Sequence, residues 1–180
     1  MIGCRVRKSF SRLLLLGALI LAFLLGLGIV NIPNAAAAIR QLEEAPGQVV
    51  YQSRQNLKDQ HGNTWQAIAF KRIRANGKTS LELRLVAFPG VAELDHNKPL
   101  LLTNSLGKTL TAADVSSTIF SDPTKPELNV AQYNIQPLLP QLQAEIPLKL
   151  TLPTLGNETV NLLVPPSFVQ DWQTLFSTQN

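Results

Sequence analysis

Two histidines are the residues of this 180-residue chain best suited to acid–base or metal chemistry. His61 follows Asp59 in a glycine-containing turn, and His96 follows Glu93 and Asp95 in a second polar segment. An imidazole beside a carboxylate can form an acid–base pair or contribute ligands to a metal ion. Turns are also rich in Asp, Asn, Gly and His, because these residues tolerate turn geometry. Neither histidine belongs to an H-E-x-x-H pattern, so a turn role is favoured for both.

Other catalytic patterns are missing from the sequence. There is no G-x-S-x-G nucleophile elbow and no glycine-rich phosphate loop, and the single cysteine is Cys4. Disulfides, thiol nucleophiles and cysteine-based metal sites are therefore excluded for the rest of the chain. The sequence predicts no catalytic, cofactor-binding or metal-binding residue, and no cofactor.

A basic cluster is the strongest local concentration of charge. It consists of Lys71, Arg72, Arg74 and Lys78. Side chains alternate along a strand, so Arg72 and Arg74 share one face and form a candidate interaction patch for an acidic partner or a lipid headgroup. The favoured alternative is a solvated strand end whose cations protect it from aggregation.

The net charge of +4 originates at the N-terminus. Four of the 16 basic residues, namely Arg5, Arg7, Lys8 and Arg12, precede the first apolar run, and the 12 that remain equal the 12 acidic residues in number. The body of the chain is therefore neutral, which excludes the basic footprint of a nucleic-acid-binding domain.

Residues 1–38 have the order of a secretory signal. The basic segment precedes an apolar run over 13–30, and an A-x-A pattern formed by Ala36 and Ala38 predicts cleavage after Ala38. A retained anchor is the alternative, because a run of this length can just span a bilayer. In both cases the positive flank stays in the cytoplasm, so the body is exported, with membrane contact only through this segment. The chain has no twin-arginine pair, which favours export in the unfolded state.

Hydrophobic periodicity divides the remaining chain into a linker over 39–47, one domain over 48–176 and a tail over 177–180. In the clearest strand, Leu81, Leu83, Leu85 and Ala87 alternate with polar residues. The segment 64–74 is apolar in both phases, as in a central strand covered on both faces. Predicted strands cover 49–57, 64–74, 80–88, 100–103, 109–111, 146–152 and 159–164, and predicted helices cover 137–144 and 168–176.

The predicted fold class is α+β. It is mainly an antiparallel sheet of about seven strands, rich in hairpins, with two short helices of which the last is C-terminal. Ser167 and Gln170 predict a capping box for that helix. Trp65 and Trp172 lie in apolar periodic contexts and are expected in the core.

Three runs of sequence carry a resemblance to a known family. They are 55–71, 81–90 and 165–175, and their most recognisable parts are a D-x-x-G-x-x-W-Q pattern (Asp59, Gly62, Trp65 and Gln66) and the pair Asp171–Trp172. Together they resemble an uncharacterised, domain-of-unknown-function family of exported cyanobacterial proteins over roughly 45–176. The resemblance implies a host with a periplasm and a thylakoid lumen, either of which the signal can reach. It implies no site residue.

These observations favour an exported, non-catalytic binding or accessory domain. Its expected partner is an unidentified protein at a photosynthetic or periplasmic membrane complex, with no nucleic acid bound. One alternative is a β-rich carrier whose interior cavity, lined by Leu81, Leu83, Leu148 and Leu150, holds an apolar small molecule. A less favoured alternative is an enzyme or metal protein that uses His61 or His96, which requires the two loops to meet in one cleft.

Overall fold

The computed structural model describes residues 15–17, 19, 39–122, 125–156 and 158–178. The chain divides into two units, 1–36 and 37–180, and the second holds the sheet. Residues 15–17 and 19 are helical, whereas the predicted cleavage residues Ala36 and Ala38 lie outside the described residues. Among the described residues, no helix has the length and apolar character needed to cross a membrane.

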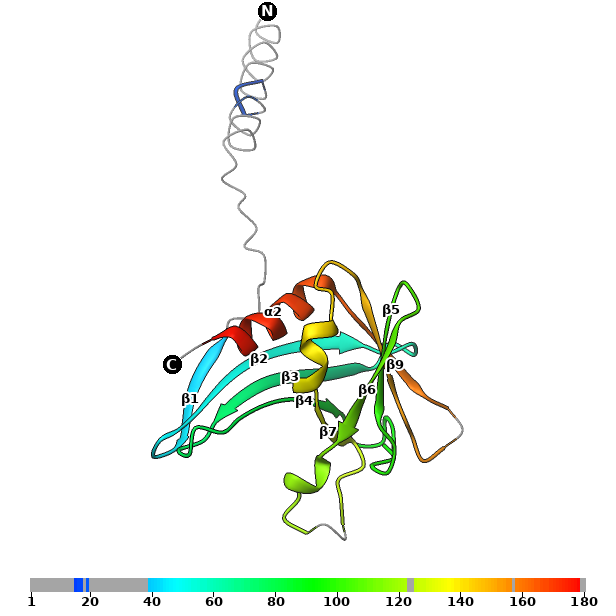
Figure 1. The fold of residues 1–180 in the computed structure, drawn as a ribbon. Coiled ribbons are helices and arrows are strands. Elements are labelled where there is room, and N and C mark those ends of the chain that lie inside the picture. Colours follow the sequence, from blue (N-terminus) through cyan, green and yellow to red (C-terminus); the bar gives the residue numbers. More distant parts are fainter. Residues whose placement is uncertain (1–14, 18, 20–38, 123–124, 157, 179–180) are drawn as a thin grey trace, which may run out of the picture. The chain divides into compact units, whose positions relative to one another are not determined.

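The described part of the second unit forms one antiparallel sheet of nine strands (Figure 1). Its order is β1-β2-β3-β4-β7-β6-β5-β8-β9. The prediction of a mainly antiparallel sheet with a C-terminal helix is confirmed, but the number of about seven strands is wrong. The strands are β1 (Arg40–Ala45), β2 (Gln48–Lys58), β3 (Thr64–Ile73), β4 (Thr79–Ala87), β5 (Leu100–Asn104), β6 (Thr109–Asp114), β7 (Val130–Asn134), β8 (Leu148–Leu152) and β9 (Val160–Val164).

The two additional strands are β1 and β7. Every residue of β1 is exposed, so the edge strand shows no apolar alternation, and residues 39–47 contain this strand where a linker was expected. β7 is only five residues long and follows a segment rich in proline. Its inward side chains, Ala131 and Tyr133, are too few to give a clear periodic signal.

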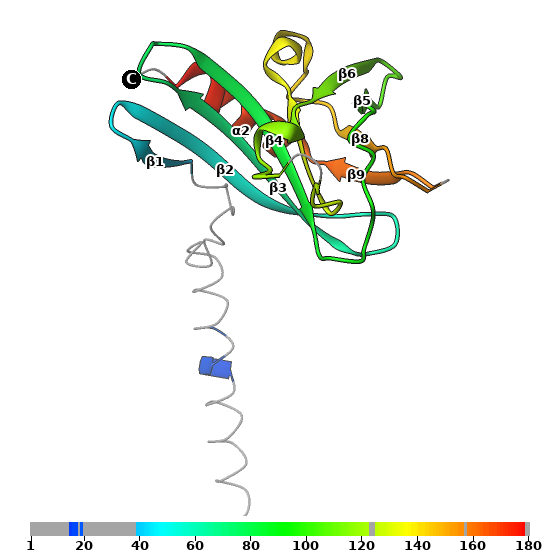
Figure 2. The ribbon, with the colours of Figure 1, turned by 90° about the horizontal axis from the view of Figure 1, so that it is seen from below.

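One helix, α2 (Pro166–Ser177), covers the concave face of the sheet (Figures 1 and 2). The predicted capping box is wrong, because the helix begins at Pro166 and its N-cap, Pro165, makes no side-chain capping bond. Proline at the first helical position needs no hydrogen-bond partner for its nitrogen. The other predicted helix is the 3-10 helix η2 (Gln136–Gln141), which ends early because Pro140 lies inside it. A second 3-10 helix, η1 (Ser116–Thr118), follows β6.

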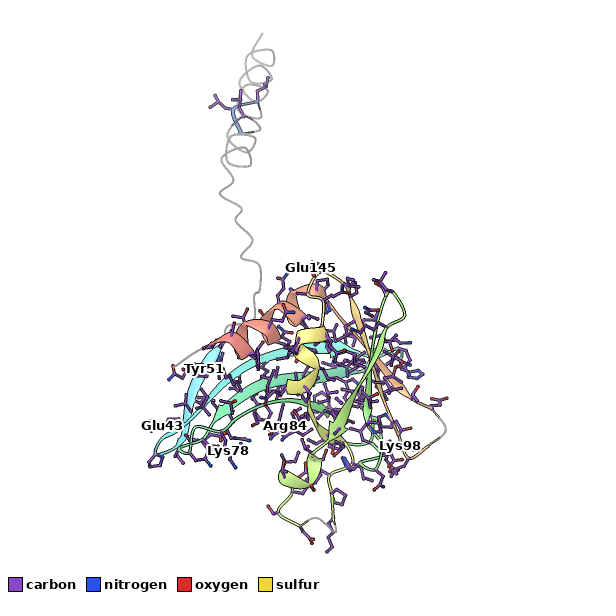
Figure 3. The ribbon with its side chains drawn as sticks, viewed as in Figure 1. Glu43, Tyr51, Lys78, Arg84, Lys98 and Glu145 are labelled. Atoms are coloured by element: carbon purple, nitrogen blue, oxygen red, sulfur yellow. The ribbon has the colours of Figure 1, made fainter. Side chains whose placement is uncertain are left out.

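The core lies between the concave face and α2. Trp65 and Trp172 are fully buried there, as expected, together with the inward leucines of β4. Burying an aromatic side chain of this size contributes roughly 2–3 kcal/mol. Figure 3 shows the two faces: Tyr51 belongs to the core beside α2, and Arg84 lies on the opposite, outer face.

Strand β3 is covered on both faces, which confirms the interpretation of its sequence. On its outer face, Ile68 and Phe70 form a separate buried cluster with Val50. The guanidinium groups of Arg72 and Arg84 lie 5.2 and 5.3 Å from the centroid of the Phe70 ring. The aliphatic part of an arginine side chain can pack on apolar surface. Arg72 and Arg84 therefore cover Phe70 on the outer face.

The two ends of the curled sheet meet at a short seam. Asp59, just after β2, forms an isolated antiparallel bridge with Leu162 of β9. The Gln60 side chain extends the seam: its Nε2 donates to the carbonyl of Thr159 at 2.8 Å, and the amide of Asn161 donates to Gln60 Oε1 at 2.7 Å. The Gln60 side chain thus provides a hydrogen-bond partner for one backbone carbonyl and one backbone amide at the edge of β9.

Candidate functional site

His61 lies in an open hollow of about 350 Å³ beside the seam. Its Nε2 is 3.8 Å from Glu158 Oε2, and both side chains are mostly exposed. Pairs of this kind contribute little to stability. The described part of the chain holds no group of three or more His, Cys, Asp or Glu residues that could bind a metal ion. The hollow is lined by Asp59, Gln60, His61, Asn63, Val91, Ala92, Glu93, Thr154, Gly156, Glu158, Thr159 and Val160.

Asp59 organises the turn that contains His61. Its Oδ1 accepts hydrogen bonds from the amides of His61 and Asn63, each at 2.9 Å, and its Oδ2 accepts from the Asn63 side chain at 3.0 Å and from Trp65 Nε1 at 3.1 Å. Burial raises the pKa of this carboxyl, but the four hydrogen bonds outweigh burial and lower it. Gly62 completes the turn with a φ of +85°. The D-x-x-G-x-x-W-Q pattern therefore has a structural explanation.

His96 lies elsewhere, at the end of β6. Its Nδ1 is 3.4 Å from Asp114 Oδ2, and its ring packs edge-on against Phe120 with a centroid distance of 5.5 Å. His96 Nε2 and the Tyr133 hydroxyl are buried without a hydrogen-bond partner among the described residues. Burial raises the pKa of Tyr133, and the charges of Asp114 and Asp95 add to this effect. None of the hollows described here is lined by both histidines.

The predicted basic cluster is divided between two faces and a turn. Lys71 points into the core side, where its Nζ donates to the carbonyls of Phe176 and Thr178, each at 2.7 Å, at the end of α2. Burial lowers the pKa of Lys71. Arg72 lies on the outer face, and Arg74 and Lys78 close the β3–β4 turn through a backbone hydrogen bond. The structure thus does not bring the four side chains together.

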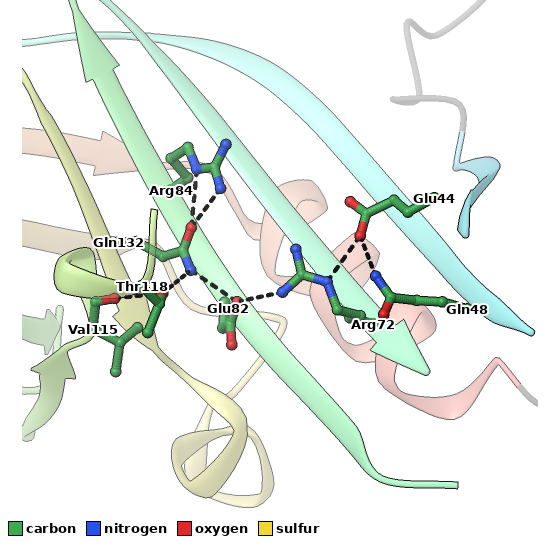
Figure 4. A network of polar contacts seen from close by, with 8 residues as sticks. All are labelled: Glu44, Gln48, Arg72, Glu82, Arg84, Val115, Thr118 and Gln132. Atoms are coloured by element: carbon green, nitrogen blue, oxygen red, sulfur yellow. Dashed lines mark hydrogen bonds and ion pairs between the residues drawn. The ribbon is translucent and has the colours of Figure 1, made fainter. Parts of the chain in front are cut away.

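A polar network crosses the outer face of β3, β4 and β7 (Figure 4). Arg72 contacts two carboxylates: its Nε is 3.1 Å from Glu44 Oε2, and its Nη1 is 3.5 Å from Glu82 Oε2. Gln132 continues the network, because its Nε2 donates to Glu82 at 2.9 Å and its Oε1 accepts from Arg84 Nε at 2.9 Å and Nη2 at 2.7 Å. Both carboxylates of the network therefore bind Arg72, and Arg84 is held by an uncharged amide.

An apolar hollow lies farther along the same face. It has a volume of about 450 Å³, and we call it the Phe88 hollow after the aromatic residue at its edge, which is 70% exposed. Its lining combines apolar side chains with three amides and a hydroxyl, a composition typical of sites that bind a ligand through apolar contacts and orient it through hydrogen bonds. It is lined by Asn56, Thr64, Gln66, Val86, Ala87, Phe88, Pro89 and Asn129.

The register of the strands explains how the two features adjoin. Arg54 pairs with Ile68, Ile68 pairs with Arg84, and Arg84 pairs with Gln132, which makes one row across the outer face. The next row on this face, two residues away on each strand, consists of Asn56, Gln66, Val86 and Val130, and the first three of these line the Phe88 hollow. The sequence shows that Arg84 faces away from the core, but it does not show which residues lie opposite.

One comparison with known proteins identifies a family. A family model described as "Protein of unknown function (DUF3122)" matches residues 37–175. No curated protein and no solved structure matches the chain. The match begins before β1 and ends within α2, so it spans every strand of the sheet.

Proposed function

The chain belongs to the DUF3122 family, and from that premise we propose that it is an exported, non-catalytic binding domain. Its role is that of an accessory factor at a periplasmic or photosynthetic membrane complex of a cyanobacterium, where it binds a protein partner. The observation that carries this proposal is the Phe88 hollow, where an exposed aromatic side chain adjoins an apolar depression on an open sheet face. Aromatic side chains in such positions are common anchors of protein interfaces.

Export is supported by the sequence of residues 1–38. The order of basic, apolar and small residues there is that of a secretory signal. The chain has no cysteine beyond Cys4, so the exported domain would have no disulfides. A chain of about 140 residues can bury roughly two thirds of its unfolded surface, so its core can stabilise it without them.

Binding is favoured over catalysis by the separation of the two histidines. His61 pairs with an exposed Glu158, and His96 packs between Asp114 and Phe120 in a different part of the sheet. A His-based enzyme would need them in one cleft.

A carrier of an apolar small molecule has less support. Leu81, Leu83 and Leu150 are at most 1% exposed within the packed core, and they line none of the three hollows described here. Leu148 borders a hollow of about 10 Å³, which is the size of one water molecule. The open Phe88 hollow is a better candidate for a binding site than the interior.

Site-specific photo-crosslinking tests the proposal. The full chain carries p-benzoylphenylalanine at position 88 in its source organism, and a matched chain carries it at Leu106, which is 75% exposed on the β5–β6 turn. We expect one protein partner to be crosslinked from position 88 and not from position 106. Mass spectrometry of the recovered chain also shows whether it begins at Ile39. Equal labelling from both positions, or none from position 88, contradicts the proposal.

A further inference from the structure

We propose that the partner presents an extended acidic segment, with its carboxylate over Arg54 and Arg84 and an apolar side chain in the Phe88 hollow. This inference rests on the proposed function and adds the chemistry of the partner to it. Three observations support it: the hydrogen bonds of Arg84, the unpaired charge of Arg54, and the spacing between this pair and the hollow.

Arg84 is a partly buried cation whose charge has no direct carboxylate partner. Its Nε and Nη2 both donate to Gln132 Oε1, and it makes no hydrogen bond to a carboxylate among the described residues. Glu82 and Glu44, the nearby acidic groups, are bound to Arg72 (Figure 4). Partly buried charges in proteins are normally paired, because removing them from water is costly. A carboxylate from outside the chain would supply that pair.

Arg54 lies on the other side of Ile68 in the same row. Its side chain is exposed and makes no hydrogen bond or ion pair with the described residues. Strands in a sheet are about 4.8 Å apart, so the Cα atoms of Arg54 and Arg84 are separated by roughly 10 Å. Arg84 uses Nε and Nη2 to bind Gln132, so its Nη1 and the exposed guanidinium of Arg54 can both be directed at one carboxylate placed above Ile68.

The electrostatic balance of the face also favours an anion. Burial lowers the pKa of Arg84, and the positive charges of Arg72 and Arg54 lower it further, whereas Glu82 and Glu44 act in the opposite direction. The two rows that hold the arginine pair and the hollow contain no acidic residue: they are Arg54, Ile68, Arg84 and Gln132, and Asn56, Gln66, Val86 and Val130. A bound carboxylate would therefore meet two cations and no like charge in these rows.

The spacing between the charge and the hollow fits an extended peptide. Val86 on β4 and Phe88, which directly follows this strand, come two and four residues after Arg84, and extended chain of that length spans roughly 7 to 13 Å. A partner strand lying along β4 has the same rise per residue. Its acidic residue and its apolar residue are therefore two to four positions apart.

A peptide selection tests this inference. Phage that display random seven-residue peptides are selected on the full-length chain, and the enriched peptides are labelled with fluorescein for anisotropy titrations. The variants are Arg84→Met, Arg54→Gln and Phe88→Ser, with Arg40→Gln as a control that removes one exposed cation from β1. Because Arg54 has no partner within the described chain, Arg54→Gln tests charge without disturbing the fold.

We expect enriched peptides to carry Asp or Glu two to four residues from an aromatic or aliphatic residue. Their Kd should rise about tenfold with Arg84→Met and about threefold with Arg54→Gln, and should not change with Arg40→Gln. Higher salt should weaken the binding.

Three outcomes overturn the inference. Enriched peptides that are apolar, sensitive to Phe88→Ser and insensitive to both arginine variants would refute the acidic segment and leave the proposed function standing. Peptides that depend neither on Phe88 nor on the arginines would refute both. Flotation with phosphatidylglycerol vesicles that depends on Arg54, without enrichment of acidic peptides, would assign the two cations to a lipid surface instead.

Discussion

Trp65 Nε1 donates a hydrogen bond to Asp59 Oδ2 at 3.1 Å, which ties the fully buried indole to the carboxylate that closes the β2–β3 turn. The same carboxylate anchors two backbone amides of the turn. Asp59 lies just after β2, and its backbone bridges to Leu162 of β9, so turn, core and seam meet at one residue.

Replacing Asp59 should therefore destabilise the domain. In Asp59→Asn, an NH₂ group replaces one carboxylate oxygen and would face the N–H groups of Asn63 and Trp65. Because these donors lose their acceptor, we expect the free energy of unfolding to fall by about 2–3 kcal/mol. The measurement is urea unfolding followed by tryptophan fluorescence. Glu145→Gln is the matched control, because Glu145 is exposed and makes no ion pair among the described residues; equal effects would contradict the assignment.

The pH dependence of the same variant follows from the lowered pKa of Asp59. A carboxyl whose pKa is lower in the folded state contributes stability above its ordinary value of 3.8, and this contribution is lost as the pH falls through the folded pKa. The wild-type chain should lose stability in this acidic range more steeply than Asp59→Asn. Parallel curves of stability against pH for the two proteins would show that the negative charge of Asp59 does not contribute to stability.

Asp171 should show the opposite behaviour. Asp171 lies on α2, where partial burial raises its pKa, and the hydrogen bond that Gln55 Nε2 of β2 donates to it at 2.5 Å only partly opposes this effect. The folded state thus favours the protonated form of Asp171. The stability that the protonated carboxyl contributes is fully present below pH 3.8 and is lost as the pH rises through the folded pKa. Asp171→Asn keeps an acceptor for Gln55 and should be at least as stable as the wild type at pH 7 by thermal unfolding. A clear loss would mean that the charge itself is needed.

Lys71 should stabilise the end of α2. Its ammonium group binds two carbonyls where the helix leaves them without partners, and cations are favourable at that end of a helix. We expect Lys71→Met to cost about 1–2 kcal/mol and to lower the helical signal in circular dichroism. Lys78→Met, which removes an exposed cation from the β3–β4 turn, should change stability by less than about 0.5 kcal/mol.

Gln60 should control the exchange of one backbone amide. The Asn161 amide donates to the Gln60 side chain instead of a strand partner, so Gln60→Ala should accelerate its hydrogen exchange, together with a loss of about 1 kcal/mol in stability. The Leu162 amide belongs to the adjoining β9 segment and serves as the internal reference. Unchanged exchange at Asn161 would show that the seam is held by other contacts.

The fold was predictable where periodicity is strong. β4 has an unbroken alternation, and the predicted strand over 80–88 nearly matches its bounds, whereas β1 carries no apolar face and its sequence resembles that of a linker. The apolar stripe over 168–176 predicts α2, although the helix begins at Pro166 and not at a capping box. The number of strands was wrong because an exposed edge strand and a five-residue strand give little signal.

The candidate site was less predictable, because it depends on register. Lys71 and Arg72 are adjacent in sequence, so strand alternation already places them on opposite faces. That Lys71 reaches the carbonyl of Thr178, 107 residues away, is visible only in the folded chain. The row from Arg54 through Ile68 to Arg84 likewise follows from two strand pairings that hairpin signals alone do not determine.

The order of the strands has a consequence for folding kinetics. β1 to β4 form from neighbouring segments, but β4 pairs next with β7, and Gln60 bonds to Thr159 across 99 residues. Loops of this length close slowly, and the apolar face of the first four strands stays uncovered until α2, the last element, is available. The domain can therefore complete its core only after the segment of α2 has been synthesised, so the final folding step follows translation of this segment.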